Sequence, residues 1–173
     1  MKGHSCCGLL PTVLVLMPIL AAAQQTATPG PEHRRLEYFV GSWNYEIKGT
    51  ESGTGTWTVE KAAGGFFFRA SETYRPSAGT SVGIGAVMGY DPVRKVYTWY
   101  RYWSNGYSDF ARGWVSGDTL VFVLDEAKQE GKDVREQITM ILAGPAYFTF
   151  KWERSVEGGP WTVTSEGTMT KVK

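Results

Sequence analysis

The segment from Gly89 to Trp114, GYDPVRKVYTWYRYWSNGYSDFARGW, decides how this chain folds. Its bulky residues recur at about every second position, a period that is typical of β-strands with one buried face. Two turn signals interrupt the pattern, the segment 92–95 and the pair Asn105-Gly106. Each turn is short enough for a hairpin, so the segment predicts consecutive antiparallel strands that crowd tryptophan rings and guanidinium groups together.

Similar strand signals continue on both sides of this segment, where runs rich in Val, Thr, Phe, Tyr and Trp alternate with short glycine-bearing turns. Strands are expected over residues 43–48, 54–62, 65–74, 82–90, 96–104, 107–115, 119–125, 133–142, 147–156 and 161–171. Short connections require antiparallel neighbours, and a long meander removes its exposed edges by closing. The predicted fold is therefore all-β: a single up-and-down antiparallel β-barrel of about ten strands. It forms one domain over residues 33–173, which begins with a short helix over 33–40.

The N-terminal residues have the pattern of a secretory signal peptide. Lys2 precedes an apolar run over residues 9–20, and small residues follow it up to Ala23. A basic start, a short apolar core and small residues at its end predict cleavage after Ala23. The apolar run is well short of the roughly 20 residues that span a membrane. We therefore expect a secreted or periplasmic protein without a membrane span, with a signal peptide over 1–23 and a disordered leader over 24–32.

The composition of the remaining chain argues against several classes of site. Cys6 and Cys7 lie in the segment to be removed, and His33 is the one histidine that stays. This leaves no disulfide framework, no usual zinc ligand set and no Ser-His-Asp triad, so no metal and no cofactor are expected. Loss of Lys2 from 18 basic residues leaves 17 against 17 acidic ones, a balance that does not favour a nucleic-acid partner.

The first hairpin of the opening segment predicts which side chains face inward. If Asp91 and Val96 close the loop over 92–95, Ala86 lies opposite Arg101. Directly opposed residues share one face of the sheet. The other face of strand 82–90 is mostly glycine, so the bulky face is expected inside. Trp99, Arg101 and Trp103 follow it there.

The second hairpin extends this inward face. A two-residue Asn-Gly turn pairs Ser104 with Tyr107, and hence Arg101 with Phe110. Phe110, Arg112 and Trp114 would then point inward too. This prediction depends on the turn, because a slip of one residue moves every side chain to the opposite face.

Alternation in other strands turns Glu72, Trp152 and Arg154 inward as well. The candidate ligand-binding residues are therefore Glu72, Trp99, Arg101, Trp103, Phe110, Arg112, Trp114, Trp152 and Arg154. Two interpretations of the inward charges stay open. Glu72 and an arginine can form an internal ion pair supported by the tryptophan rings, or an arginine can hold an anionic group of a ligand.

Two motifs resemble those of a known family. Gly41-Ser42-Trp43 resembles the G-x-W opening of lipocalin and calycin barrels, and the resemblance implies that Trp43 packs across the closed end of a barrel. The segment LEYFVGSWNYE, residues 36–46, together with MGYDPVRKVY, residues 88–97, is similar to a group of mostly bacterial, secreted, lipocalin-like proteins defined as a domain of unknown function. This resemblance implies an interior cavity for a small apolar or amphipathic molecule and implies no reaction.

The chain departs from two ligand-binding barrel types. Haem-binding barrels of similar form use a histidine on a late strand, and strands 147–156 and 161–171 contain none. Fatty-acid-binding barrels have a two-helix lid between their first two strands, for which the connection 49–53 is too short.

Three functions stay open at this stage. The chain can bind a small hydrophobic or amphipathic molecule, with or without an anionic group, outside the cytoplasm. It can be a cofactor-free isomerase or cyclase that uses Glu72, a tyrosine and an arginine. It can also be a barrel filled by its own rings, which binds another envelope protein through its outer surface.

We expect the mature protein, purified from its host, to begin at Gln24, because cleavage follows the small residues that end the apolar core. N-terminal sequencing of the exported protein measures this directly. An intact Met1 in a cytoplasmic fraction would contradict the signal-peptide prediction.

Overall fold

A computed structural model describes residues 28–172. The predicted signal peptide, 1–23, and the first part of the predicted leader, 24–27, lie outside the described residues. The elements are α1 (Pro31–Arg35), the 3-10 helix η1 (Leu36–Phe39), β1 (Gly41–Gly49), β2 (Gly53–Ala62), the 3-10 helix η2 (Ala63–Gly65), β3 (Phe67–Pro76), β4 (Val82–Asp91), β5 (Val96–Trp103), β6 (Ser108–Ser116), β7 (Thr119–Leu124), β8 (Ala127–Gln129), β9 (Lys132–Leu142), β10 (Tyr147–Val156) and β11 (Thr162–Lys171).

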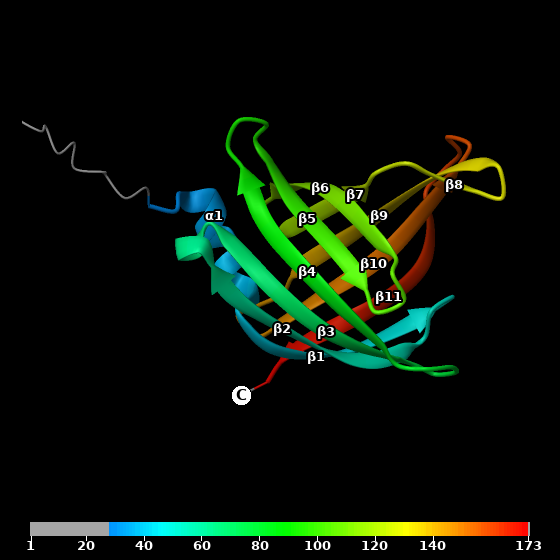
Figure 1. Ribbon diagram of the computed structural model, residues 1–173, viewed down its shortest axis with the longest axis horizontal. Helices are drawn as coiled ribbons and strands as arrows, with labels where there is room; N and C mark the ends of the chain where they lie inside the picture. Colours follow the sequence, from blue (N-terminus) through cyan, green and yellow to red (C-terminus); the bar gives the residue numbers. More distant parts are fainter. Residues whose placement is uncertain (1–27, 173) are drawn as a thin grey trace, which may run out of the picture.

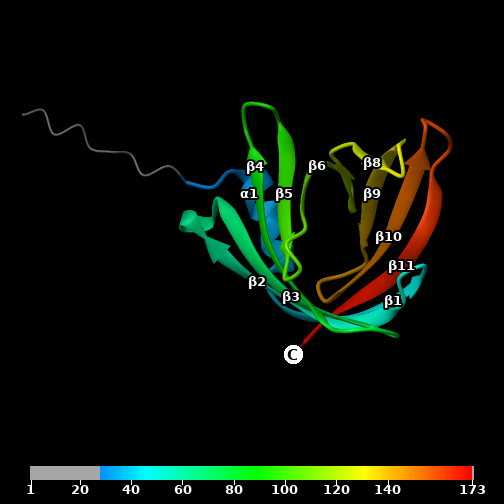
Figure 2. The ribbon, with the colours of Figure 1, turned by 45° about the vertical axis from the view of Figure 1, so that its right-hand side comes forward.

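The strands form one antiparallel sheet that closes on itself. Neighbours follow the order β10-β11-β1-β2-β3-β4-β5-β6-β7-β9, and β10 also pairs with β9, so the two ends of the order meet. The short strand β8 forms a hairpin with the start of β9. Figures 1 and 2 show the resulting barrel, with α1 against one end and β8 near the other. The prediction of a closed up-and-down β-barrel is confirmed.

Aromatic side chains close the end of the barrel next to the helices. Trp43 is fully buried, and its Nε1 donates a hydrogen bond to the carbonyl oxygen of Phe39 at 2.7 Å. Phe39 lies edge-on to Trp57 and to Phe148, with ring centroids 5.5 Å apart in each pair. Such edge-to-face pairs add to the free energy gained by burying the rings. Trp43 therefore has the end-closing position that the lipocalin resemblance implies.

The N-terminal helical segment differs in detail from the prediction. α1 begins at Pro31, where a proline suits the first turn of a helix, so residues 31 and 32 of the expected leader are helical. From Leu36 the chain continues as a 3-10 helix rather than an α-helix. The Tyr38 hydroxyl shares its one hydrogen between the carbonyl oxygens of Gly144 and Tyr147, at 2.7 and 2.8 Å, which fixes the segment against the turn between β9 and β10. Between residues 28 and 172, no helix has the length and apolar character needed to cross a membrane.

The hairpin β4–β5 has the predicted register. Asp91 pairs with Val96, and Ala86 with Arg101. Oδ1 of Asp91 accepts hydrogen bonds from two backbone N–H groups inside the turn, at 2.9 and 3.0 Å. This aspartate-capped turn fixes the pairing, and Trp99 and Arg101 face the interior as expected.

The turn between β5 and β6 differs from the prediction. A type I′ turn needs a positive φ at both central residues, and in the pair Asn105-Gly106 the positive φ, of 89°, occurs at the glycine alone. The Trp103 N–H instead donates to the carbonyl oxygen of Tyr107 at 2.8 Å, across a loop of three residues. A three-residue loop with glycine at its left-handed position is a common alternative for this sequence.

The longer loop shifts the register of β6 by one residue. Arg101 pairs with Asp109 rather than with Phe110. Because the period of a strand is two, the shift moves the other face of β6 inward. The prediction that Phe110, Arg112 and Trp114 face the interior is therefore wrong, and the Trp114 side chain lies outside, 51% exposed.

We expect replacement of Phe39 by alanine to lower the free energy of unfolding by about 3–5 kcal/mol, because a fully buried ring would leave a cavity in the closed end. Urea denaturation measures the change. The matched control is Phe67→Ala, since Phe67 is 44% exposed on the outer face and should cost about 1 kcal/mol or less. Equal losses for the two variants would show that Phe39 does not close the barrel.

Candidate ligand-binding cavity

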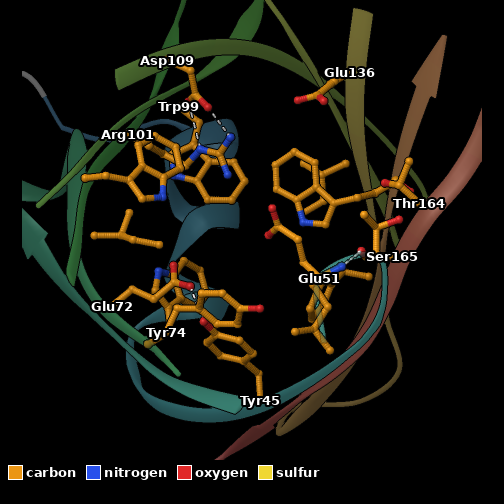
Figure 3. A pocket seen from close by; sticks show the side chains of 18 of the residues that line it. Tyr45, Glu51, Glu72, Tyr74, Trp99, Arg101, Asp109, Glu136, Thr164 and Ser165 are labelled. Atoms are coloured by element: carbon orange, nitrogen blue, oxygen red, sulfur yellow. Dashed lines mark hydrogen bonds and ion pairs between the residues drawn. The ribbon is translucent and has the colours of Figure 1, made fainter. Parts of the chain in front are cut away.

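A cavity of about 440 Å³ lies inside the barrel, between the closed end and the turns at the opposite end. Its aromatic lining comes from Tyr45, Trp57, Tyr74, Trp99, Trp103, Tyr107, Phe148, Phe150 and Trp152. Figure 3 shows side chains from several strands converging on this space. The volume and the ring-rich lining are typical of pockets for small organic molecules.

Arg101 and Asp109 form a buried ion pair in the wall of the cavity. Nε and Nη2 of Arg101 donate to the two carboxylate oxygens at 2.9 and 2.5 Å (Figure 3), and the side chains are 8% and 9% exposed. The guanidinium carbon lies 4.7 to 4.9 Å from the ring centroids of Trp99, Trp103 and Trp152. The positive charge is therefore held both by a bidentate carboxylate and by the negative faces of three indoles.

A second ion pair lies on β9 and β10. Nε and Nη2 of Arg154 donate to Oε1 of Glu136 at 3.0 and 2.6 Å. Among the described residues, two arginines line the cavity, Arg101 and Arg154. Each of them already forms an ion pair with a carboxylate.

Glu72 is not the partner of Arg101. The Tyr45 hydroxyl donates to Oε1 of Glu72 at 2.6 Å (Figure 3). Burial raises the pKa of Glu72 above its usual value, against the opposing effects of this hydrogen bond and of the positive charge of Arg101. Burial and the charge of Glu72 likewise raise the pKa of Tyr45. The buried carboxyl group therefore keeps its proton to a higher pH than an exposed glutamate does.

The cavity brings most of the sequence-predicted site residues together. Its lining includes Glu72, Trp99, Arg101, Trp103, Trp152 and Arg154. It does not include Phe110, Arg112 and Trp114, which the register shift places outside. There the Arg112 guanidinium forms an ion pair with exposed Asp125 and lies 4.8 Å from the Phe110 ring.

Other cavity residues were not predicted from the sequence. Tyr45 lies two residues after Trp43 on the inward face of β1, so strand alternation contained the signal for it. Asp109 becomes an inward residue only with the three-residue turn. Glu51 reaches the cavity from the turn between β1 and β2, a position that no strand period defines.

No protein-family model and no curated protein sequence matches this chain. Solved structures match its fold. Rv2717c from M. tuberculosis has 14% sequence identity and a TM-score of 0.60, over 83% of this chain and 99% of that one. The S-type phycobiliprotein lyase CPES from Guillardia theta has 14% identity and a TM-score of 0.56, over 82% and 93%. At this identity the likeness shows the fold alone, a lipocalin-like β-barrel.

We expect Asp109→Asn to lower the free energy of unfolding by about 3–5 kcal/mol, because it leaves the charge of Arg101 buried without a counter-charge. The matched control is Asp125→Asn, which breaks the arginine–aspartate pair on the surface and should cost at most about 1 kcal/mol. Urea denaturation of both variants tests this. If both variants lose a similarly small free energy of unfolding, the charge of Arg101 does not depend on Asp109 for its stabilisation.

Proposed function

We propose that this chain binds a small hydrophobic or amphipathic molecule inside the barrel, outside the cytoplasm. The observation that carries the proposal is the cavity of about 440 Å³ lined by aromatic rings. A barrel filled by its own side chains, the alternative that acts through its outer surface, would not contain such a space. The extracytoplasmic part of the proposal rests on the signal-peptide pattern of residues 1–23.

A buried polar atom adds support for a ligand. Trp99 lines the cavity, and among the described residues its Nε1 has no hydrogen-bond partner. A buried donor without an acceptor is unfavourable. An oxygen or nitrogen acceptor on a bound molecule would satisfy it, so we expect the ligand to be amphipathic rather than purely apolar.

The ion pairs of the cavity argue against an anionic end group on the ligand, which the sequence left open. An anion would have to displace Asp109 from Arg101 or Glu136 from Arg154. Displacement of Asp109 would leave its carboxylate buried without a partner, which is costly. The proposal therefore does not include an anionic group as the feature by which the cavity selects its ligand.

One observation favours an enzyme as a second candidate. Glu72 is a buried carboxyl group with a raised pKa, and it shares a hydrogen bond with Tyr45 at the edge of the cavity. A carboxyl group of this kind can act as a general acid toward a bound molecule. The test is conversion of a molecule that co-purifies with the protein, with Glu72→Gln expected to lose conversion even when that molecule is present at a saturating concentration.

We expect N-phenyl-1-naphthylamine, a neutral fluorescent amphipath, to bind in the cavity and gain emission. Ile84→Trp fills part of the lining and should weaken this binding at least about tenfold by overpacking. Val87→Trp is the matched control, because Val87 lies on the outer face of the same strand, 38% exposed. Equal affinity of both variants, with thermal unfolding to show that each is folded, would place the probe outside the barrel and contradict the proposal.

A further inference from the structure

Carboxyl groups outnumber positive charges in the cavity. Its acidic lining residues are Glu51, Glu72, Asp109, Glu136 and Glu153, against Arg101 and Arg154. The arginines pair with Asp109 and Glu136, and the Glu153 carboxylate accepts a hydrogen bond from Lys151 at 2.8 Å. Between residues 28 and 172, no basic side chain forms an ion pair with Glu51 or Glu72. The carboxyl groups of these two residues therefore have no ion-pair partner among the described residues, although the charge of Arg101 acts on Glu72.

Both carboxyl groups line the cavity and act on the same tyrosine, Tyr45. The Tyr45 ring, whose hydroxyl bonds to Glu72, is stacked with the Tyr74 ring at a centroid distance of 6.4 Å and an angle of 14°. Burial raises the pKa of both tyrosines, and the negative charge of Glu51 adds to the rise in each. Figure 3 shows Glu72 and both tyrosines on one side of the cavity, with Glu51 extending toward them from the side of Ser165. A group bound there would contact carboxyl oxygens and aromatic ring faces together.

The interior already holds one positive charge by these means. The Arg101 guanidinium is surrounded by a carboxylate and three indole rings, so ring faces and a carboxylate suffice to hold a cation in this barrel. The Arg101 guanidinium itself occupies that site, so a ligand cation cannot bind there. The Glu51–Glu72 side offers the same chemistry, with carboxyl groups and tyrosine rings, and no basic side chain of the described residues forms an ion pair with either carboxyl group.

We propose that the ligand of this cavity is an aromatic or hydrophobic molecule with a positively charged nitrogen, which binds between Glu51 and Glu72 while the apolar part lies among the tryptophan rings. This inference rests on the proposed function and adds the charge of the ligand to it. A primary ammonium supplies three N–H donors for the carboxyl oxygens, and hydrogen bonds between charged groups are roughly twice as strong as neutral ones.

Binding of such a cation should release a proton from Glu72. The groups that act on Glu72 are the Tyr45 hydroxyl and the charge of Arg101, and Tyr74 and Glu51 act in turn on Tyr45. A cation beside Glu72 favours the ionised carboxylate. Because the pKa of Glu72 lies above the usual 4.5, affinity for the cation should rise as the pH rises from that value through the pKa of the folded protein. A neutral ligand should show no such rise.

Three naphthalene probes of similar size test the charge preference by isothermal titration calorimetry: 2-naphthylmethylamine, 2-naphthalenemethanol and 2-naphthoate. We expect the amine to bind at least about tenfold more tightly than the alcohol, and the carboxylate to bind more weakly than the alcohol. Titrations in buffers of different ionisation enthalpy, repeated as the pH is raised, measure the proton that the amine releases.

Single replacements locate the preference. Glu72→Gln and Glu51→Gln should each lower the affinity for the amine by about tenfold and leave the affinity for the alcohol nearly unchanged. Glu51 is an exposed turn residue, so its variant keeps the test valid if Glu72→Gln does not fold. The control is Glu46→Gln on the outer face of β1, where Glu46 pairs with Lys48. It removes the same charge and should change neither affinity.

The outcomes separate the two proposals. Equal binding of amine and alcohol, with both weakened by Ile84→Trp, would overturn the charge inference and leave the cavity as the binding site. An equal loss of amine affinity in Glu46→Gln would show a diffuse attraction rather than a seat between Glu51 and Glu72, and would overturn it too. Failure of all three probes to bind would overturn the proposed function together with the inference.

Discussion

The positive charge of Arg101 constrains the whole interior of this barrel. A guanidinium that is nearly excluded from water needs a counter-charge and hydrogen-bond acceptors close by. Asp109 supplies both from the next strand, and three indole rings complete the enclosure. The rings that surround the charge also form part of the cavity wall. The position of one ion pair therefore determines how much apolar ring surface a ligand meets.

Two neighbouring hairpins show how far the sequence alone could predict this arrangement. Asp91 lies directly before the loop 92–95 and accepts hydrogen bonds from two backbone N–H groups inside it, so one register is favoured and the prediction for β4–β5 is confirmed. The pair Asn105-Gly106 is compatible with both a two-residue and a three-residue hairpin loop, and the turn preferences of these residues do not distinguish the two. The two-residue loop would place Phe110 opposite Arg101 on the inward face, whereas the three-residue loop places Asp109 there. The closed barrel and the inward face of β5 could be predicted, whereas the ion pair and the turn residue Glu51 depend on tertiary contacts.

The two ends of the barrel perform different tasks. At the helical end, Trp43, Phe39 and Phe148 fill the interior with rings in contact, and the Lys171 ammonium group lies 5.1 Å from the centroid of the Trp43 ring. Toward the other end the rings separate around a space, and carboxyl groups appear between them. The stability of the fold can thus come mainly from the packed end, which leaves the other end able to hold polar groups that a tightly packed core does not tolerate.

Under the proposed function, the turn that presents Glu51 also affects how fast a ligand leaves. The N–H of Thr50 donates to the carbonyl oxygen of Thr164 at 2.8 Å, and that of Glu51 to Oγ of Ser165 at 3.2 Å, so the turn is tied to β11 by two hydrogen bonds. With the opposite end packed by rings, exchange with solvent proceeds at the end where this turn lies. A turn tied in this way opens less often than a free loop, which lengthens the residence time of a bound molecule without any change in the contacts that hold it.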